Sequence, residues 1–122
     1  MSSKAIFVYG TLRRGCANRH ARLLERSAQF LGKARVEGRL YRVDSYPGIT
    51  LGGEADDWVV GDLFDLKDPD TLTALDEYEG SEYRRVLTMA VLEGGTESQC
   101  WVYEFIGPVT EARRIVSGDW MA

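Results

Sequence analysis

Two short stretches of this 122-residue chain combine residue types that could support chemistry. The first is Val8-Tyr9-Gly10-Thr11-Leu12, which follows an apolar run and precedes Arg13-Arg14-Gly15. A strand that ends in a glycine turn can present a row of backbone N–H groups, and these form a small anion-binding concavity. Such a loop would suit a carboxylate or a phosphate. The alternative is that Gly10 only lets the chain leave a sheet, since glycine is the default turn residue.

The second stretch is acidic and falls at the C-terminal end of a predicted helix. It contains Asp76, Glu77 and Glu79, with Glu82 just beyond. The helix dipole and the neighbouring carboxylates both disfavour ionisation there, so they raise the carboxylate pKa from its reference of about 4.3 for Glu. A raised pKa is what a general base requires to work near neutral pH. The alternative is a solvated acidic turn.

If the two stretches meet, one site would hold an anion-binding loop and a carboxyl group able to take and return a proton. No protein nucleophile with a partner base is evident, which suits a reaction in which the substrate brings its own nucleophile. Intramolecular attack gains much from orientation, with effective molarities of up to about 10⁵–10⁸ M. The elements that carry the two stretches decide whether they meet.

Those elements are predicted from hydrophobic periodicity and from turn residues. Strands are predicted over residues 5–9, 32–43, 58–66, 83–92 and 99–106, and helices over 18–30, 69–78 and a short segment that ends at 115. Residues 45–49 are predicted to be a turn, and Gly38 a bulge or bend. Asn18 and Asp68 are the expected N-caps, with Pro69 at the first helical position and Gly80 as a stop. The pattern indicates an α+β fold with a mainly antiparallel, strongly bent sheet.

Composition narrows the class of protein. The length favours a single domain over residues 1–122, and the net charge of −4 with no basic tail gives little support to a nucleic-acid partner. No apolar stretch is long enough to cross a bilayer, and the first residues lack a signal-peptide core, so we expect a cytoplasmic protein. Cys16 and Cys100 would then be reduced thiols. His20 is the one histidine, so no zinc site of the usual His/Cys kind can be assembled. We expect His20 itself at the surface.

Taken together, these residues resemble the gamma-glutamylcyclotransferase-like family. The resemblance is closest to short bacterial members and to the gamma-glutamylamine cyclotransferase branch, and order and spacing match over nearly the whole chain. The motifs that carry it are Val8-Tyr9-Gly10-Thr11-Leu12 with Arg13 and Gly15, Tyr46-Pro47-Gly48, Leu75-Asp76-Glu77-Tyr78-Glu79-Gly80 with Tyr83-Arg84, and Ser117-Gly118-Asp119-Trp120.

The resemblance implies a small mixed, mainly antiparallel β-barrel that is flanked by a few helices and has a cavity at one end. It implies that the backbone of Tyr9, Gly10, Thr11 and Leu12 holds the α-carboxylate and α-amine end of a gamma-glutamyl group. Glu79 falls on the family's acid/base glutamate, and Tyr83 falls on a tyrosine that lines the cavity. Tyr46 and Pro47 are expected near the cavity mouth, and Trp120 is expected to close the core.

In the reaction that the resemblance implies, the α-amine of a small-molecule gamma-glutamyl substrate attacks its own γ-carbonyl. The products are 5-oxoproline and a free amine, and no metal or cofactor is expected. Trp101, Tyr103, Arg13 and Arg84 could shape the leaving-group side, or they could serve barrel packing and surface charge. The alternative function is a non-catalytic protein that binds a gamma-glutamyl or amino-acid-like ligand. Glu79 favours the enzyme, because a carboxylate adds nothing to the simple binding of an anion.

Overall fold

The computed structural model describes residues 5–10, 12, 19–52, 57–68 and 70–120. In chain order its elements are β1 (Ala5–Val8), α1 (Arg19–Ser27), β2 (Ala28–Arg42), β3 (Pro47–Leu51), β4 (Trp58–Leu66), α2 (Asp70–Glu79), β5 (Tyr83–Leu92), β6 (Glu97–Phe105), the 3₁₀ turn η1 (Glu111–Arg113) and β7 (Arg114–Ile115). Within these residues, neither helix has the length and apolar character needed to cross a membrane.

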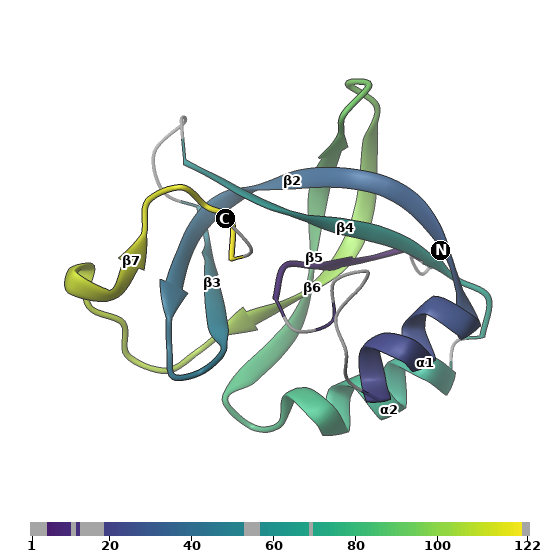
Figure 1. Ribbon diagram of the computed structural model, residues 1–122, viewed down its shortest axis with the longest axis horizontal. Coiled ribbons are helices and arrows are strands. Elements are labelled where there is room, and N and C mark those ends of the chain that lie inside the picture. The colour runs from purple at the N-terminus through teal and green to yellow at the C-terminus, as the bar shows by residue number, and fades with distance from the viewer. Residues whose placement is uncertain (1–4, 11, 13–18, 53–56, 69, 121–122) are drawn as a thin grey trace.

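Five strands close into a mixed barrel, in the order β1-β4-β2-β3-β6 and back to β1 (Figure 1). The pairs β1–β4, β4–β2 and β2–β3 are antiparallel, whereas β3–β6 and β6–β1 are parallel. Strand β5 extends the sheet by pairing with β6 and β2, and β7 pairs with β2. Helices α1 and α2 lie side by side against one side of the barrel (Figure 1). The predicted fold class is therefore confirmed.

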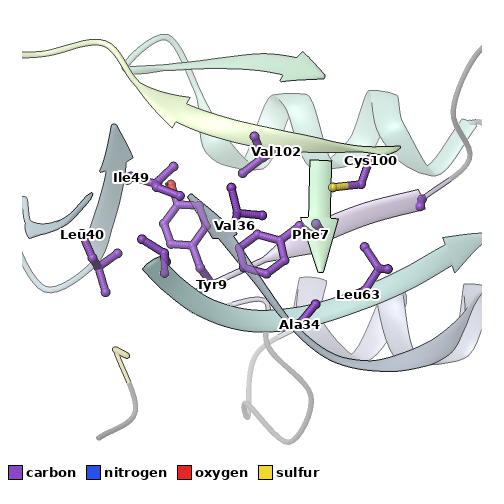
Figure 2. Packing of buried hydrophobic residues seen from close by; sticks show 12 residues of the cluster. Phe7, Tyr9, Ala34, Val36, Leu40, Ile49, Leu63, Cys100 and Val102 are labelled. Carbon is purple, nitrogen blue, oxygen red and sulfur yellow. Dashed lines mark hydrogen bonds between the residues drawn. The ribbon is translucent and has the colours of Figure 1, made fainter. Parts of the chain in front are cut away.

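Strand β1 is buried on both faces, which explains its unbroken apolar sequence. Successive side chains of a strand point to opposite faces. Phe7 and Tyr9 enter the cluster inside the barrel, with their ring centroids 6.4 Å apart (Figure 2). Ile6 and Val8 enter a second cluster, which α1 and α2 cover with Leu24 and Leu75. Because β1 is fixed from both sides, the residues that follow it start from a rigid position.

Strand β2 begins earlier than the sequence pattern indicates, so the helix predicted over residues 18–30 is wrong at its C-terminal end. Ala28 and Phe30 instead pair with β4, and the rings of Phe30 and Phe64 meet edge to face with centroids 5.5 Å apart. This cross-strand pairing outweighs the local helical pattern. The register shift in the pairing of β2 with β4 lies between Phe30 and Gly32, not at Gly38. At Gly38 the strand changes its partner from β4 to β3.

Two further expectations near short strands are wrong. Residues 47–49 belong to strand β3 and not to a turn, because they pair with β2 and run parallel to β6. Proline is tolerated there as the first residue of the strand. The predicted helical segment before Ile115 is reduced to η1, and residues 114–115 form β7 against β2. By contrast, β4 and β5 have the predicted bounds.

Helix α2 begins and ends at the predicted caps. The Asp68 carboxylate accepts a hydrogen bond from the N–H of Asp70 at 2.9 Å. At the other end, Gly80 has φ of 79°, and its N–H donates to the Asp76 carbonyl at 3.1 Å. Pro69 and the predicted cap Asn18 lie outside the described residues. The helix therefore stops at Glu79, which fixes the place of this carboxylate in the fold.

We expect Gly61→Ala to destabilise the fold by about 1–3 kcal/mol, because it overpacks the contact between β4 and β1. A Cβ at this position would clash with the Val8 carbonyl oxygen and would lie 2.7 Å from Cζ of Phe7. Urea unfolding of the variant measures the loss. Gly94→Ala in the β5–β6 turn is the matched control, since its Cβ would meet no atom within 4 Å. Equal free energies of unfolding for both variants would contradict the overpacking.

Candidate functional site

A cavity of about 430 Å³ lies where β1 ends and α2 ends. Its lining comes from β1 and the residues after it (Phe7, Val8, Tyr9, Gly10 and Leu12), from the β2–β3 connection (Ser45, Tyr46 and Pro47), from the end of α2 and the start of β5 (Tyr78, Glu79, Glu82 and Tyr83), and from β6 (Tyr103). The two stretches that the sequence singles out therefore meet in one cavity. Thr11 lies outside the described residues.

Glu79 is the partly buried carboxylate in the wall of this cavity. Burial raises its pKa from 4.5 to about 7. The direction agrees with the prediction, but the cause is loss of solvation rather than the helix dipole or the neighbouring carboxylates. Among the residues that the structure describes, no hydrogen bond or ion pair holds the Glu79 carboxylate. A carboxyl group of this kind can exchange a proton near neutral pH.

Three tyrosines surround Glu79, and each is anchored elsewhere by its hydroxyl. Tyr9 donates to the Tyr103 carbonyl at 2.5 Å, Tyr83 to the Pro47 carbonyl at 2.6 Å, and Tyr103 to Oδ1 of Asp76 at 2.6 Å. The pKa of each tyrosine is raised, mainly by burial, and the charge of Glu79 adds to each shift. The tyrosine hydroxyls are thus committed to structural acceptors and stay protonated at neutral pH.

Gly10 is required by a close approach and not by its backbone conformation. Its φ is not among the positive values of the described glycines, so a left-handed backbone conformation is not what requires glycine here. A Cβ on Gly10 would lie 2.6 Å from Cγ and 2.9 Å from Cδ of Pro47. The Tyr83 hydroxyl holds the carbonyl of the same proline. Pro47 therefore packs the β2–β3 connection directly onto the loop after β1, a contact that the separate sequence motifs do not reveal.

Comparison with known proteins decides the family. A family model described as gamma-glutamyl cyclotransferase, AIG2-like, matches residues 6–122. The chain belongs to this family. The gamma-glutamylcyclotransferase family protein YtfP of Escherichia coli K12 is 34% identical over 119 residues, which are 95% of each chain. The gamma-glutamylaminecyclotransferase of Rattus norvegicus is 36% identical over 117 residues, which cover 80% of this chain and 75% of the rat protein.

The fold agrees with this assignment. The crystal structure of an AIG2-like protein from Mus musculus matches with a TM-score of 0.74 and 28% sequence identity, over 91% of this chain and 82% of the mouse chain. The resemblance found in the motifs is therefore confirmed, and the chain is an enzyme of the gamma-glutamylcyclotransferase type. Enzymatic function replaces a non-catalytic binding role as the general assignment.

In this cyclotransferase the remaining predicted residues divide between the cavity and the rest of the barrel. Leu12, Tyr46, Pro47 and Tyr83 line the cavity. Tyr103 also lines it, and at the same time it packs in the buried cluster that α1 and α2 cover. Trp101 and Arg84 are not in the lining: Trp101 packs outside the barrel interior, and Arg84 pairs with Glu104 at 3.2 Å. Trp120 packs against the interior cluster, with Arg42 over its ring. The structure does not describe Arg13, Cys16 or the side chain of His20.

The described lining of this cyclotransferase cavity carries two carboxylates, Glu79 and Glu82, and no Lys, Arg, His or Cys. Glu82 accepts a hydrogen bond from the Tyr46 hydroxyl at 3.0 Å, which leaves Glu79 as the carboxylate without a donor. Cys100 is a buried free thiol away from the cavity, and burial raises its pKa to about 12. No cluster of His, Cys, Asp or Glu suited to a metal ion occurs within the described part of the chain.

Proposed function

We propose that this enzyme converts a gamma-glutamyl amide or peptide into 5-oxoproline and a free amine. One observation carries the proposal: Glu79, with a pKa of about 7 and no hydrogen-bond donor among the described residues, faces the same cavity as Tyr9 and Gly10. A loop that holds the α-end of a gamma-glutamyl group would place the α-nitrogen and the γ-carbonyl carbon within reach of one carboxylate. Positioning of two groups of one molecule supplies much of the rate enhancement in such a reaction.

Glu79 is the acid and base in this mechanism. Its carboxylate accepts a proton from the substrate α-ammonium, and the neutral α-amine then attacks the γ-carbonyl carbon. The new N–C bond closes a five-membered ring and gives a tetrahedral intermediate. Collapse of this intermediate breaks the bond to the leaving nitrogen, while Glu79 passes protons from the ring nitrogen to that nitrogen. The ring product is 5-oxoproline, the amine leaves in its ammonium form, and Glu79 returns to its starting state.

This mechanism assigns roles to three other parts of the site. The backbone of residues 9–12 binds the α-carboxylate and α-amine end, as the family resemblance implies. Tyr83 closes the wall beside Glu79, with its hydroxyl held by Pro47. The buried aromatic side chains exclude water, which keeps the Glu79 pKa high and disfavours hydrolysis of the acyl group.

Substrate and reaction are tested together by a mass-spectrometric assay for 5-oxoproline. The purified protein is incubated with gamma-glutamyl amines and gamma-glutamyl dipeptides, and Glu79→Gln serves as the control. We expect release of 5-oxoproline with wild type alone, and the most active substrate names the leaving-group class. Absence of release from the whole panel, combined with no thermal stabilisation by any of its members, would reject the proposal.

The rate should also report the Glu79 pKa. Because only the ionised carboxylate can accept a proton, we expect kcat/KM to fall tenfold for each pH unit below about 7 and to level off above it. We use kcat/KM rather than kcat because its dependence on pH reports the pKa values of groups in the free enzyme. Initial rates of 5-oxoproline release from pH 5 to 9 measure this profile. A limb near pH 4.5, the ordinary value of a glutamate, would mean that burial does not raise the pKa of Glu79 in the free enzyme.

A further inference from the structure

The site is assembled from two parts that are far apart in the sequence, and Tyr103 on β6 contacts both. Its backbone carbonyl accepts the hydrogen bond of Tyr9, the residue that precedes Gly10. Its side-chain hydroxyl donates to Oδ1 of Asp76, one helical turn before Glu79. Tyr103 is itself buried and lines the cavity. One residue of the barrel therefore joins the loop side of the site to the helix side.

The helix end of this connection is braced further. Arg85, the cross-strand partner of Tyr103, donates to Asp76 from Nε at 2.9 Å and from a terminal nitrogen at 3.3 Å. The guanidinium of Arg85 also lies over the Trp101 ring, 4.3 Å from its centroid. Two cross-strand neighbours thus converge on one carboxylate of α2. A bidentate, stacked guanidinium is geometrically specific, so Asp76 is held in one place.

The loop end is also fixed by more than one contact. Besides donating to Tyr103, the Tyr9 hydroxyl accepts a hydrogen bond from the N–H of Ile49 at 3.2 Å. Figure 2 shows the Tyr9 ring inside the barrel, with its hydroxyl beside Ile49. The Tyr9 hydroxyl is therefore an anchor for the start of the loop that lines the cavity.

We propose that Tyr103 is the positioning residue of the site, which sets the distance between the loop after β1 and the Glu79 carboxylate. The role rests on the proposed function, because that distance matters only where the loop and Glu79 act on one substrate. The two bonds of Tyr103 serve different steps. The backbone bond to Tyr9 supports substrate binding, and the side-chain bond to Asp76 supports proton transfer.

Two single-atom deletions separate these roles. In Tyr103→Phe the backbone bond to Tyr9 remains and only the bond to Asp76 is lost, so we expect kcat to fall about tenfold with little change in KM. In Tyr9→Phe the loop loses its anchor while Asp76 keeps both partners, so we expect KM to rise about tenfold with little change in kcat. A general loss of stability would not divide the two parameters in this way.

The control variants either remove a tyrosine hydroxyl away from the cavity or keep a hydrogen-bond acceptor at position 76. Tyr41→Phe removes a buried tyrosine hydroxyl that interacts with Arg39 outside the cavity, and it should leave both kinetic parameters unchanged. Asp76→Asn retains an acceptor for Tyr103, so it should keep more of kcat than Asp76→Ala does. All rates are measured well below the melting temperature of each variant.

Hydrogen exchange of the backbone amides gives a readout that needs no turnover. Tyr103→Phe should speed exchange of the amides at the end of α2, residues 76–80, and leave those of β1 unchanged, whereas Tyr9→Phe should do the reverse. If the wild type is inactive but the two variants show this exchange pattern, the proposed reaction is rejected, whereas the structural connection through Tyr103 stands. If the wild type is active, either of two results would overturn the positioning role. One is an unchanged kcat in Tyr103→Phe, and the other is the same change of KM and kcat in both variants.

Discussion

Glu79→Gln is expected to lower kcat by about 10²–10⁴-fold, the range that general acid–base groups contribute. The amide has nearly the same shape and no ionisable proton, so the cavity is retained while proton transfer is lost. The wild-type carboxylate is suited to this transfer because burial brings its pKa to about 7. The kcat for 5-oxoproline release measures the effect, with the best substrate from the panel.

The loss should be confined to turnover. Because the loop of residues 9–12 is untouched, we expect the variant to bind substrate with an affinity within about threefold of wild type, as measured by calorimetry without turnover. Glu77→Gln is the matched control, since Glu77 is an exposed carboxylate on the same helix and is absent from the cavity lining. Activity of Glu79→Gln at the level of Glu77→Gln would rule out the acid/base role.

The sequence predicts those parts of the fold whose pattern is local. The sequence predicts strands β4 and β5 with their observed bounds, and Asp68 and Gly80 predict the caps of α2. The family motifs also identify the two stretches that meet in the cavity. These features depend on neighbours in sequence, so a single chain is enough to find them.

The segments of the fold that the sequence predicts wrongly depend on partners that are distant in the chain. Residues 28–30 read as the end of a helix but pair with β4, and residues 47–49 read as a turn but complete the barrel between β2 and β6. The contacts of Tyr103 with Tyr9 and Asp76 span 94 and 27 positions of the chain, so no local pattern in the sequence predicts them. The cause of the raised Glu79 pKa is likewise tertiary, because burial comes from the barrel and not from the helix.

Gly10→Val is expected to raise KM by at least about tenfold, because the loop must move away from Pro47 and misplacements of about 1 Å are costly at a reacting centre. The proline ring cannot yield easily: Pro47 starts β3, pairs with Arg42 and is held through its carbonyl by Tyr83. A Cβ on residue 10 would lie 2.6 Å from that ring. Steady-state kinetics of 5-oxoproline release measure KM, and unfolding in urea shows whether the fold survives.

The origin of this effect is testable with a second change at the point of contact. Pro47→Ala removes Cγ and Cδ, the two atoms that a side chain at position 10 would meet, so adding it to Gly10→Val should recover part of the lost affinity. Non-additivity of this kind is the signature of residues in contact. Gly94→Val, at a turn with no atom within 4 Å of its Cβ, should leave KM unchanged. If Gly10→Val kept the wild-type KM, the loop after β1 would not be the part of the protein that holds the substrate.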